Sequence, residues 1–236
     1  MKRVLALVGT VAALALAAWL LNDLAQSTTY QVVGTLVDHV GTTQRVVALT
    51  LDDGPAPEMV DDVLSVLAEK QVKATFFVTG EALHDSPESG RKIVAAGHEM
   101  GNHSWSHRQL VFTWPSVMRN EIEFTDAQIR AAGETGDILV RPPYGSKLFG
   151  LPLYLWRHNR TSVTWDVAAD LGVSPAQSPS ALVAGAVARV RPGSIILLHI
   201  WYPSHNPSFL SLGPLIDAVR ADGYRFVTAR ELLAIR

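Results

Sequence analysis

Residues 49–55 read Leu49-Thr50-Leu51-Asp52-Asp53-Gly54-Pro55, an apolar run that stops at two adjacent carboxylates. The run predicts a buried strand, and the Gly-Pro pair after it marks a sharp turn. Two neighbouring aspartates repel each other unless a cation or an arginine lies nearby. Side chains at successive strand positions diverge, so one acid could bind a metal while the other moves protons. Taken alone, the motif is more often a plain turn in which Asp53 caps the next helix.

Short β-rich runs alternate with helical patterns along the rest of the chain. The predicted strands are Val46–Leu51, Ala74–Thr79, His98–Asn102, Ile138–Arg141, Ser162–Asp166, Ser194–His199 and Tyr224–Thr228. Predicted helices lie around residues 59–67 and before Gly97, and then at Ser116–Ala132, Ser178–Val190 and Leu212–Ala221. This alternation favours an α/β fold of parallel strands joined by crossover helices, in an open sheet or a barrel.

The composition narrows the class of protein. With 236 residues, of which 48% are hydrophobic, the chain can bury the core of one domain. Its net charge of −2 gives no strong field to recruit nucleic acid, so we expect no nucleic-acid partner. There is no cysteine, so any metal must be held by histidine, aspartate or glutamate.

The N-terminus resembles a membrane anchor. Lys2 and Arg3 precede an uncharged apolar run from Val4 to Leu21, which is at the lower edge of the length that spans a bilayer. A cleaved signal peptide, giving a secreted or periplasmic protein, is the alternative. We expect residues 1–24 to be an uncleaved anchor with the rest outside the cytoplasm, residues 25–45 to be a linker with a short hairpin at Tyr30–Val37, and residues 46–236 to be the catalytic domain.

Residues that can act as acids, bases or metal ligands follow the predicted strands, at the end where α/β folds place their ligands. His103 and His107 are four residues apart, a spacing that places both imidazoles on one side of a helical turn. With Asp53 they would form a metal site of two histidines and one carboxylate. The histidine spacing alone is more often without such meaning.

Two further strand ends add candidates. Arg141 precedes Pro142-Pro143-Tyr144-Gly145; it could hold Asp52 ionised as a base, and the backbone N–H of Tyr144 could donate to an oxyanion. A rigid loop with a surface arginine is the plain alternative. His199 ends an apolar strand, where a lone histidine is usually only a hydrogen-bonding residue.

Four segments in this order resemble the motifs of the polysaccharide deacetylases of carbohydrate esterase family 4, the NodB homology domain. They are Thr50-Leu51-Asp52-Asp53-Gly54-Pro55, His103-Ser104-Trp105-Ser106-His107, Arg141-Pro142-Pro143-Tyr144-Gly145 and Leu197-Leu198-His199. The resemblance runs from about Val46 to the C-terminus. It implies a distorted (β/α) barrel of about seven parallel strands that removes N-acetyl groups from amino sugars.

The resemblance also implies a role for each matching residue. Asp53, His103 and His107 would hold a divalent metal, usually zinc. Asp52 would be the general base, oriented by Arg141, and His199 the general acid that protonates the leaving amine. The substrate-binding residues would be Pro143, Trp105 and Trp201.

The chain departs from the family pattern at two positions. Leu51 replaces a phenylalanine, which should only adjust packing. The family commonly has an acid three positions after Trp165, where this chain has Ala168. Either Asp166 or Asp170 would then take over that charge, or His199 would be weakly tuned.

The sequence therefore predicts a membrane-tethered, metal-dependent hydrolase that acts on N-acetylated glycan such as peptidoglycan, chitin-like polymer or poly-N-acetylglucosamine. We expect a monomer. One alternative keeps the chemistry but changes the substrate to another C–N amide, such as a formylated lipid-linked sugar or a cyclic imide. A third reading is a non-catalytic carbohydrate-binding relative, and Ala168 is its only support.

Overall fold

A sheet of parallel strands forms the centre of the computed structural model, which describes residues 2–171, 178–202 and 206–235. The strand order is β4-β3-β2-β7-β6. These strands are β2 (Val46–Asp52), β3 (Thr75–Val78), β4 (Glu99–Asn102), β6 (Val167–Ala168) and β7 (Ile195–His199). All seven residues of β2 are buried, as expected for an apolar strand covered on both faces.

The remaining strands turn the sheet towards a barrel. β8 (Arg225–Val227) pairs with the first half of β2 on the side where β3 pairs with the second half. Single-residue bridges at Val140 link β4 to β5 (Thr161–Val163), which pairs in parallel with β1 (Thr35–Val37). The result is the expected distorted α/β barrel of parallel strands, left partly open.

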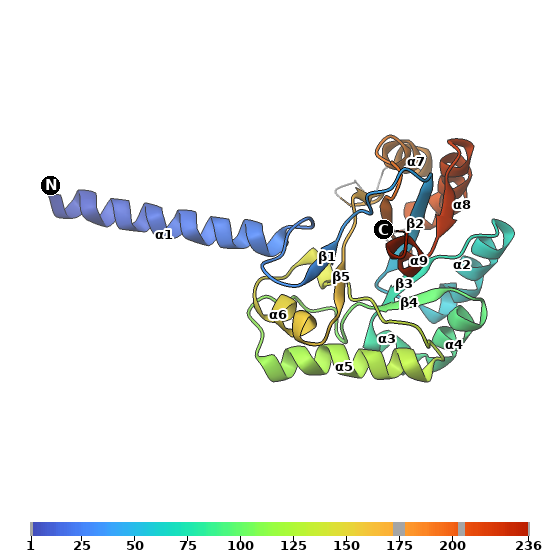
Figure 1. The fold of residues 1–236 in the computed structure, drawn as a ribbon, viewed down its shortest axis with the longest axis horizontal. Helices are drawn as coiled ribbons and strands as arrows, with labels where there is room; N and C mark the ends of the chain where they lie inside the picture. Colours follow the sequence, from blue (N-terminus) through green and yellow to red (C-terminus); the bar gives the residue numbers. More distant parts are fainter. Residues whose placement is uncertain (1, 172–177, 203–205, 236) are drawn as a thin grey trace.

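Helices lie outside these strands (Figure 1). They are α2 (Pro57–Glu69), α3 (Gly80–Asp85), α4 (Pro87–Ala95), α5 (Pro115–Ala131), α6 (Gly150–Arg157), α7 (Pro179–Val187), α8 (Asn206–Ala221) and α9 (Ala229–Leu233). Four of them begin with proline, whose missing N–H is not needed in the first helical turn. The main apolar core lies between the sheet and α2, α4, α7 and α8.

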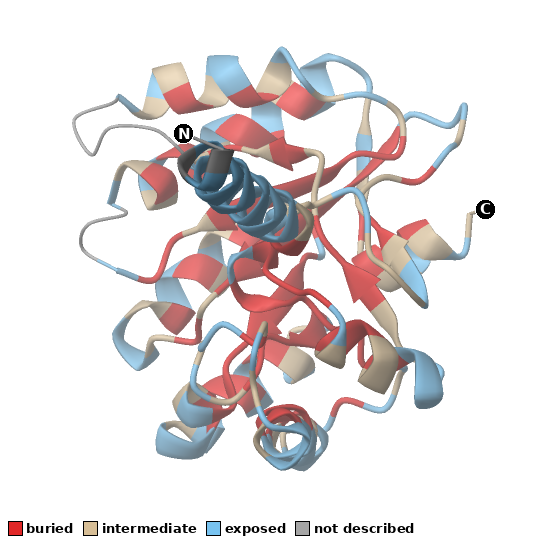
Figure 2. Cartoon of the chain, turned by 90° about the vertical axis from the view of Figure 1, so that its left-hand side faces the viewer, coloured by how far each residue is buried: buried red, intermediate tan, exposed pale blue. Residues whose placement is uncertain are grey.

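The first helix, α1 (Lys2–Gln26), projects away from the body (Figure 1). Figure 2 looks at the molecule from this side and shows that almost all of α1 is exposed. An 18-residue window within Leu5–Gln26 has a mean hydropathy of 2.0, and the segment is long and apolar enough to cross a membrane.

Three details differ from the sequence predictions. The strand expected at Ile138–Arg141 is reduced to the bridges at Val140, because the prolines at 142 and 143 have no N–H to continue a ladder. No hairpin forms at Tyr30–Val37; only Thr35–Val37 is extended, and it pairs with β5 instead. Helix α8 begins at Asn206 rather than Leu212 and continues through an internal proline.

Candidate active site

Two adjacent strands bring the first pair of candidate residues together. In the register of β2 and β7, Asp52 stands opposite His199. The chain then leaves the sheet sharply, because Asp53 adopts a left-handed backbone conformation with φ of 76°. Gly54 follows, where a Cβ atom would lie 2.2 Å from the ring of Trp201. The turn therefore requires glycine for close packing.

The segment from His103 to His107 is a loop and not the helical turn assumed from its spacing. Ser104 and His107 both have positive φ, of 66° and 54°. The buried Glu121 of α5 fixes the loop by accepting hydrogen bonds from the backbone N–H groups of residues 105 and 106, each at 2.9 Å. The two imidazoles still meet, with ring centroids 4.9 Å apart.

Asp53, His103 and His107 form a cluster whose ligand atoms all lie within 4.8 Å of one another. His103 Nδ1 is 2.7 Å from the carbonyl oxygen of Arg141, which can only accept, so Nδ1 donates. In the neutral ring Nε2 then carries a lone pair, and it faces Asp53 Oδ1 at 3.4 Å.

The contacts of Asp53 fit a bound cation. Its Oδ1 is buried without a hydrogen bond from the described residues, and His107 Nε2 lies 3.0 Å away. Burial opposes ionisation of Asp53, but the facing imidazoles of His103 and His107 outweigh it and hold the pKa of Asp53 well below its usual range. Two imidazole nitrogens and one carboxylate oxygen are ligands that suit zinc and similar divalent metals.

Arg141 is fully buried and is held from several sides. Its Nη1 donates to Asp52 Oδ1 at 2.6 Å and to Thr50 Oγ1 at 2.7 Å, and its Nη2 donates to the Thr164 carbonyl at 2.8 Å. Burial lowers the pKa of Arg141, and the Asp52 carboxylate opposes this change. The guanidinium thus neutralises Asp52 and fixes its orientation, while Asp52 Oδ2 lies 3.6 Å from His103 Nε2.

Asp170, and not Asp166, contacts His199. Asp170 Oδ1 lies 3.1 Å from His199 Nδ1, and Asp170 Oδ2 accepts the backbone N–H of His199 at 2.7 Å. Burial disfavours the imidazolium, but Asp170 and the charges of Asp52 and Asp53 outweigh it and raise the pKa of His199 to about 9. Asp166 instead accepts the backbone N–H of Ile195 at the start of β7.

These residues surround one cavity of about 340 Å³. It is lined by Asp52, Asp53, His103, His107, Tyr144, Trp165, Asp170, Leu171 and His199. Tyr144 is 57% exposed, has a positive φ of 60°, and its ring lies 4.7 Å from that of His107. The sequence did not single out Trp165 and Leu171 as lining residues, although both flank the candidate acids.

The three predicted substrate-binding residues lie elsewhere. Trp105 packs against Phe124 and the backbone of Gly80, away from the cavity. Trp201 is only 2% exposed and borders a neighbouring cavity of about 320 Å³ that shares Asp53 as a wall. Pro143 is buried in the turn that carries Tyr144.

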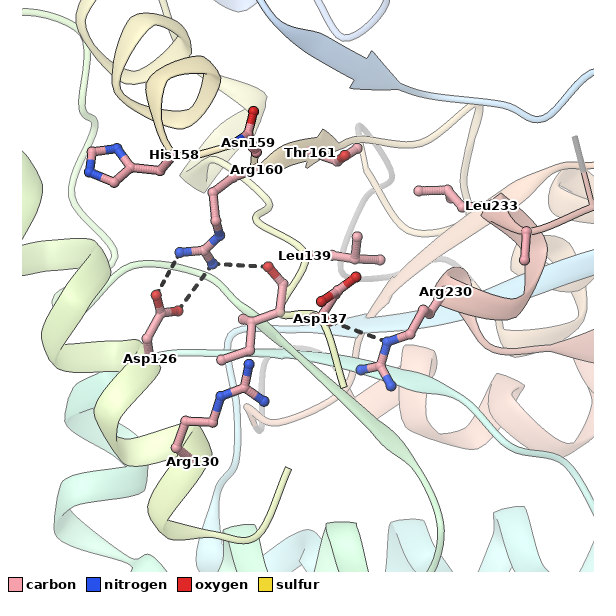
Figure 3. A pocket seen from close by; sticks show the side chains of 12 residues that line it. Asp126, Arg130, Asp137, Leu139, His158, Asn159, Arg160, Thr161, Arg230 and Leu233 are labelled. Carbon is pink, nitrogen blue, oxygen red and sulfur yellow. Dashed lines mark hydrogen bonds and ion pairs between the residues drawn. The ribbon is translucent and has the colours of Figure 1, made fainter. Parts of the chain in front are cut away.

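A larger cavity of about 560 Å³ lies apart from this site, beside β5 and α9 (Figure 3). Three arginines line it, and their contacts are structural. Arg160 pairs with Asp126 at 2.6 Å, Arg230 donates to the Asp137 carbonyl, and Arg130 donates to the carbonyls of residues 134 and 136. These contacts join α5 and α9 to the segments on either side of Val140.

Sequence comparison agrees with the family that the motifs resemble. A family model described as polysaccharide deacetylase matches residues 39–175. The chain belongs to the polysaccharide deacetylase family. It is 33% identical over 192 residues to a chitooligosaccharide deacetylase of Bradyrhizobium sp., covering 76% of this chain and 87% of that one. It is 30% identical to a peptidoglycan-N-acetylglucosamine deacetylase of Listeria monocytogenes, covering 80% of this chain but only 39% of that longer protein.

Solved structures share the deacetylase fold. A peptidoglycan N-acetylglucosamine deacetylase in complex with a hydroxamate-type benzamide has a TM-score of 0.77 and 30% identity, covering 84% of this chain and 92% of that one. A family 4 pseudoenzyme from Bacillus anthracis also has a TM-score of 0.77, at 23% identity, covering 86% and 70%. The fold alone therefore does not decide activity, and the residues in the cavity must.

Proposed function

We propose that this polysaccharide deacetylase is a metal-dependent hydrolase that removes N-acetyl groups from the amino sugars of a cell-envelope or extracellular glycan. One observation carries the proposal. A three-residue metal cluster, an aspartate paired with arginine, and a histidine paired with aspartate all line the same cavity. The named activities of the chitooligosaccharide and peptidoglycan deacetylases it resembles support this choice of substrate.

Asp53, His103 and His107 would hold the metal, which we expect to be zinc. When bound, such an ion supplies a Lewis acid that polarises the amide carbonyl and makes water a better nucleophile. The protein itself holds two of the reacting groups deep in the cavity, where His103 is 2% exposed and Asp52 1% exposed.

Proton transfer is assigned to the two residues that stand opposite each other on β2 and β7. Asp52, held by Arg141, accepts a proton from the attacking water as the water oxygen bonds to the amide carbon. His199, protonated because of Asp170, donates a proton to the sugar nitrogen as the C–N bond breaks. The products are acetate and a free amine. We assign the oxyanion contact to the backbone N–H of Tyr144.

The cellular location of the protein is inferred from α1. We propose that α1 is a membrane anchor and that the catalytic part lies outside the cytoplasm, where the substrates of the Listeria relative's named activity are found. A signal peptide passes the same test of length and hydropathy, so cleavage is settled by the N-terminal sequence of the mature protein.

The alternative of a non-catalytic, carbohydrate-binding protein rests on Ala168. Asp170 contacts His199 from a different position, so the loss of an acid at 168 leaves the histidine paired. A change of substrate to another C–N amide keeps every residue in the same role, and a substrate screen distinguishes it.

Acetate release from N-acetylglucosamine oligomers by the zinc-supplemented full chain tests the proposal. We expect Asp52→Asn to reduce the rate by about 10²–10⁴-fold, and His103→Ala to remove both activity and zinc binding. The matched control is Asp62→Asn, an exposed carboxylate on α2. Wild-type rates in Asp52→Asn would contradict the assignment, and sugar binding without turnover would favour the binding-only reading.

A further inference from the structure

The base of α1 is fixed to the catalytic body rather than joined to it by a loose segment. Ala25 is 3% exposed, and its carbonyl accepts the backbone N–H of Lys147 at 2.8 Å. The carbonyl of Ser27 accepts a hydrogen bond from the Lys147 ammonium, and that of Thr28 accepts one from Thr164 Oγ1 at 2.5 Å. These three contacts hold the base of α1 against the body.

This attachment lies beside the catalytic cavity. Thr28 Cγ2 is 3.4 Å from the position of a Cβ atom at Gly145, the neighbour of the cavity-lining Tyr144. Thr164 donates to Thr28, accepts from Arg141 through its carbonyl, and precedes the cavity-lining Trp165. The base of α1 thus borders two walls of the active site.

The length of α1 leaves little distance between a bilayer and this attachment. The 22 residues of Leu5–Gln26 would extend about 33 Å, close to the ~30 Å of a hydrocarbon core. The uncharged run ends at Leu21, four residues or about 6 Å of helix before the docked Ala25. If α1 spans the membrane, the cavity must lie close to the lipid headgroups.

Exposed aromatic side chains occur just after α1 and in segments that face the side of the body from which α1 leaves. Phe112 is 87% exposed and Trp114 79% exposed, in the segment that leads into α5. Trp156 on α6 is 54% exposed and Tyr30 is 55% exposed. Figures 1 and 2 agree that α6 and the N-terminal end of α5 face the side from which α1 leaves. Tryptophan and tyrosine are enriched where proteins meet the membrane surface.

We propose that the face formed by Tyr30, Phe112, Trp114 and Trp156 rests on the lipid bilayer and holds the active site at headgroup level. The enzyme would then deacetylate a glycan that is attached to the membrane or lies on its surface, rather than polymer more distant from the bilayer. The substrate part of this inference rests on the proposed function, whereas the lipid contact does not.

The lipid contact can be measured without activity. The chain has no cysteine, so Phe112→Cys accepts a single spin label. The control is Leu210→Cys, a position that is 56% exposed on α8, the helix that lies across the body from α1 in Figure 1. In full-length protein reconstituted in liposomes, we expect the label at 112 to collide with oxygen more than with a water-soluble nickel complex, and the label at 210 to do the reverse. Equal collision ratios at the two positions would overturn the proposal.

The substrate part has its own readout in the same liposomes. We expect the double variant Phe112→Ser, Trp114→Ser to lose about ten-fold in rate on a lipid-anchored N-acetylglucosamine oligomer, while its rate on the free oligomer stays within about two-fold. Leu210→Ser should change neither rate. An unchanged preference in the double variant would refute the membrane-bound substrate, and a wild type inactive on both oligomers would refute the proposed function alone.

Discussion

Replacing Asp170 with asparagine tests how this chain keeps its general acid protonated. The pKa of His199 is raised from 6.5 to about 9, against the effect of burial, by Asp170 and by the charges of Asp52 and Asp53. At about 1.4 kcal/mol per pKa unit, this favours the imidazolium by about 3 kcal/mol. Asp170 makes the hydrogen bond that raises this pKa most and adds its own charge, so Asp170 should carry most of the effect.

The sign of the effect follows from the role of His199 as an acid. Activity falls as the pH rises through the pKa of His199, so the alkaline limb of kcat/KM should lie near pH 9 in the wild type. In Asp170→Asn we expect this limb to move down by about two units, because Asp170 carries most of the stabilisation of the imidazolium. The rate should fall about ten-fold at pH 8 and recover towards pH 6. Fluorescent detection of the released amine on N-acetylglucosamine oligomers measures the profile.

Asparagine keeps the shape of the side chain and can still accept the backbone N–H of His199 and the hydroxyl of Ser208, so the fold should persist. The control is Asp166→Asn, which lies nearby in sequence but contacts the start of β7. Its alkaline limb should match the wild type. An unmoved limb in Asp170→Asn, with normal circular dichroism, would refute the electrostatic argument.

Three further predictions concern stability. Gly54→Ala should lower the free energy of unfolding by about 1–3 kcal/mol, because its Cβ would lie 2.2 Å from the ring of Trp201. Burial and the charge of Lys73 lower the pKa of His98 from 6.5 to about 4, so stability present above pH 6.5 should be lost as the pH falls towards 4, by about 3 kcal/mol. Removing divalent metal should lower the melting temperature by several degrees, because a ligand at about 100 times its Kd stabilises by about 2.7 kcal/mol.

Each of these three predictions has a control, and all measurements use the full chain solubilised in detergent. Gly185→Ala should not destabilise, because the added Cβ on α7 meets nothing within 4 Å; equal losses at both glycines would contradict the packing argument. In His98→Gln the acid-dependent loss in urea unfolding should shrink, and an unchanged pH dependence would rule out His98. Zinc added to His103→Ala should not restore the melting temperature; full restoration would place the metal elsewhere.

The central strands were predictable because each is a short apolar run that ends in a polar residue. Val46–Leu51 was predicted and Val46–Asp52 forms, and Ser194–His199 became Ile195–His199. Elements that depend on distant partners were not predictable. β1 is extended because β5 lies beside it, and β6 has only two residues, too few for a recognisable pattern.

The same division applies to the site. Residues at strand ends were found because adjacent parallel strands bring their C-terminal ends together, as Asp52 and His199 show. The choice between Asp166 and Asp170 depended on the path of the chain after β5, which no local pattern encodes. Glu121 was missed for a similar reason. It lies in the middle of α5, and only the tertiary fold brings it to the loop between His103 and His107.

The opposition of Asp52 and His199 across neighbouring strands has a consequence for engineering. Their separation is set by the backbone ladder of the sheet, while the cavity rim is built by segments such as those bearing Tyr144 and Leu171. Rim segments could therefore be exchanged among relatives to alter which glycan is accepted, with the proton-transfer geometry left intact. The chain therefore provides a fixed pair of proton-transfer residues around which rim segments of different substrate specificity can be placed.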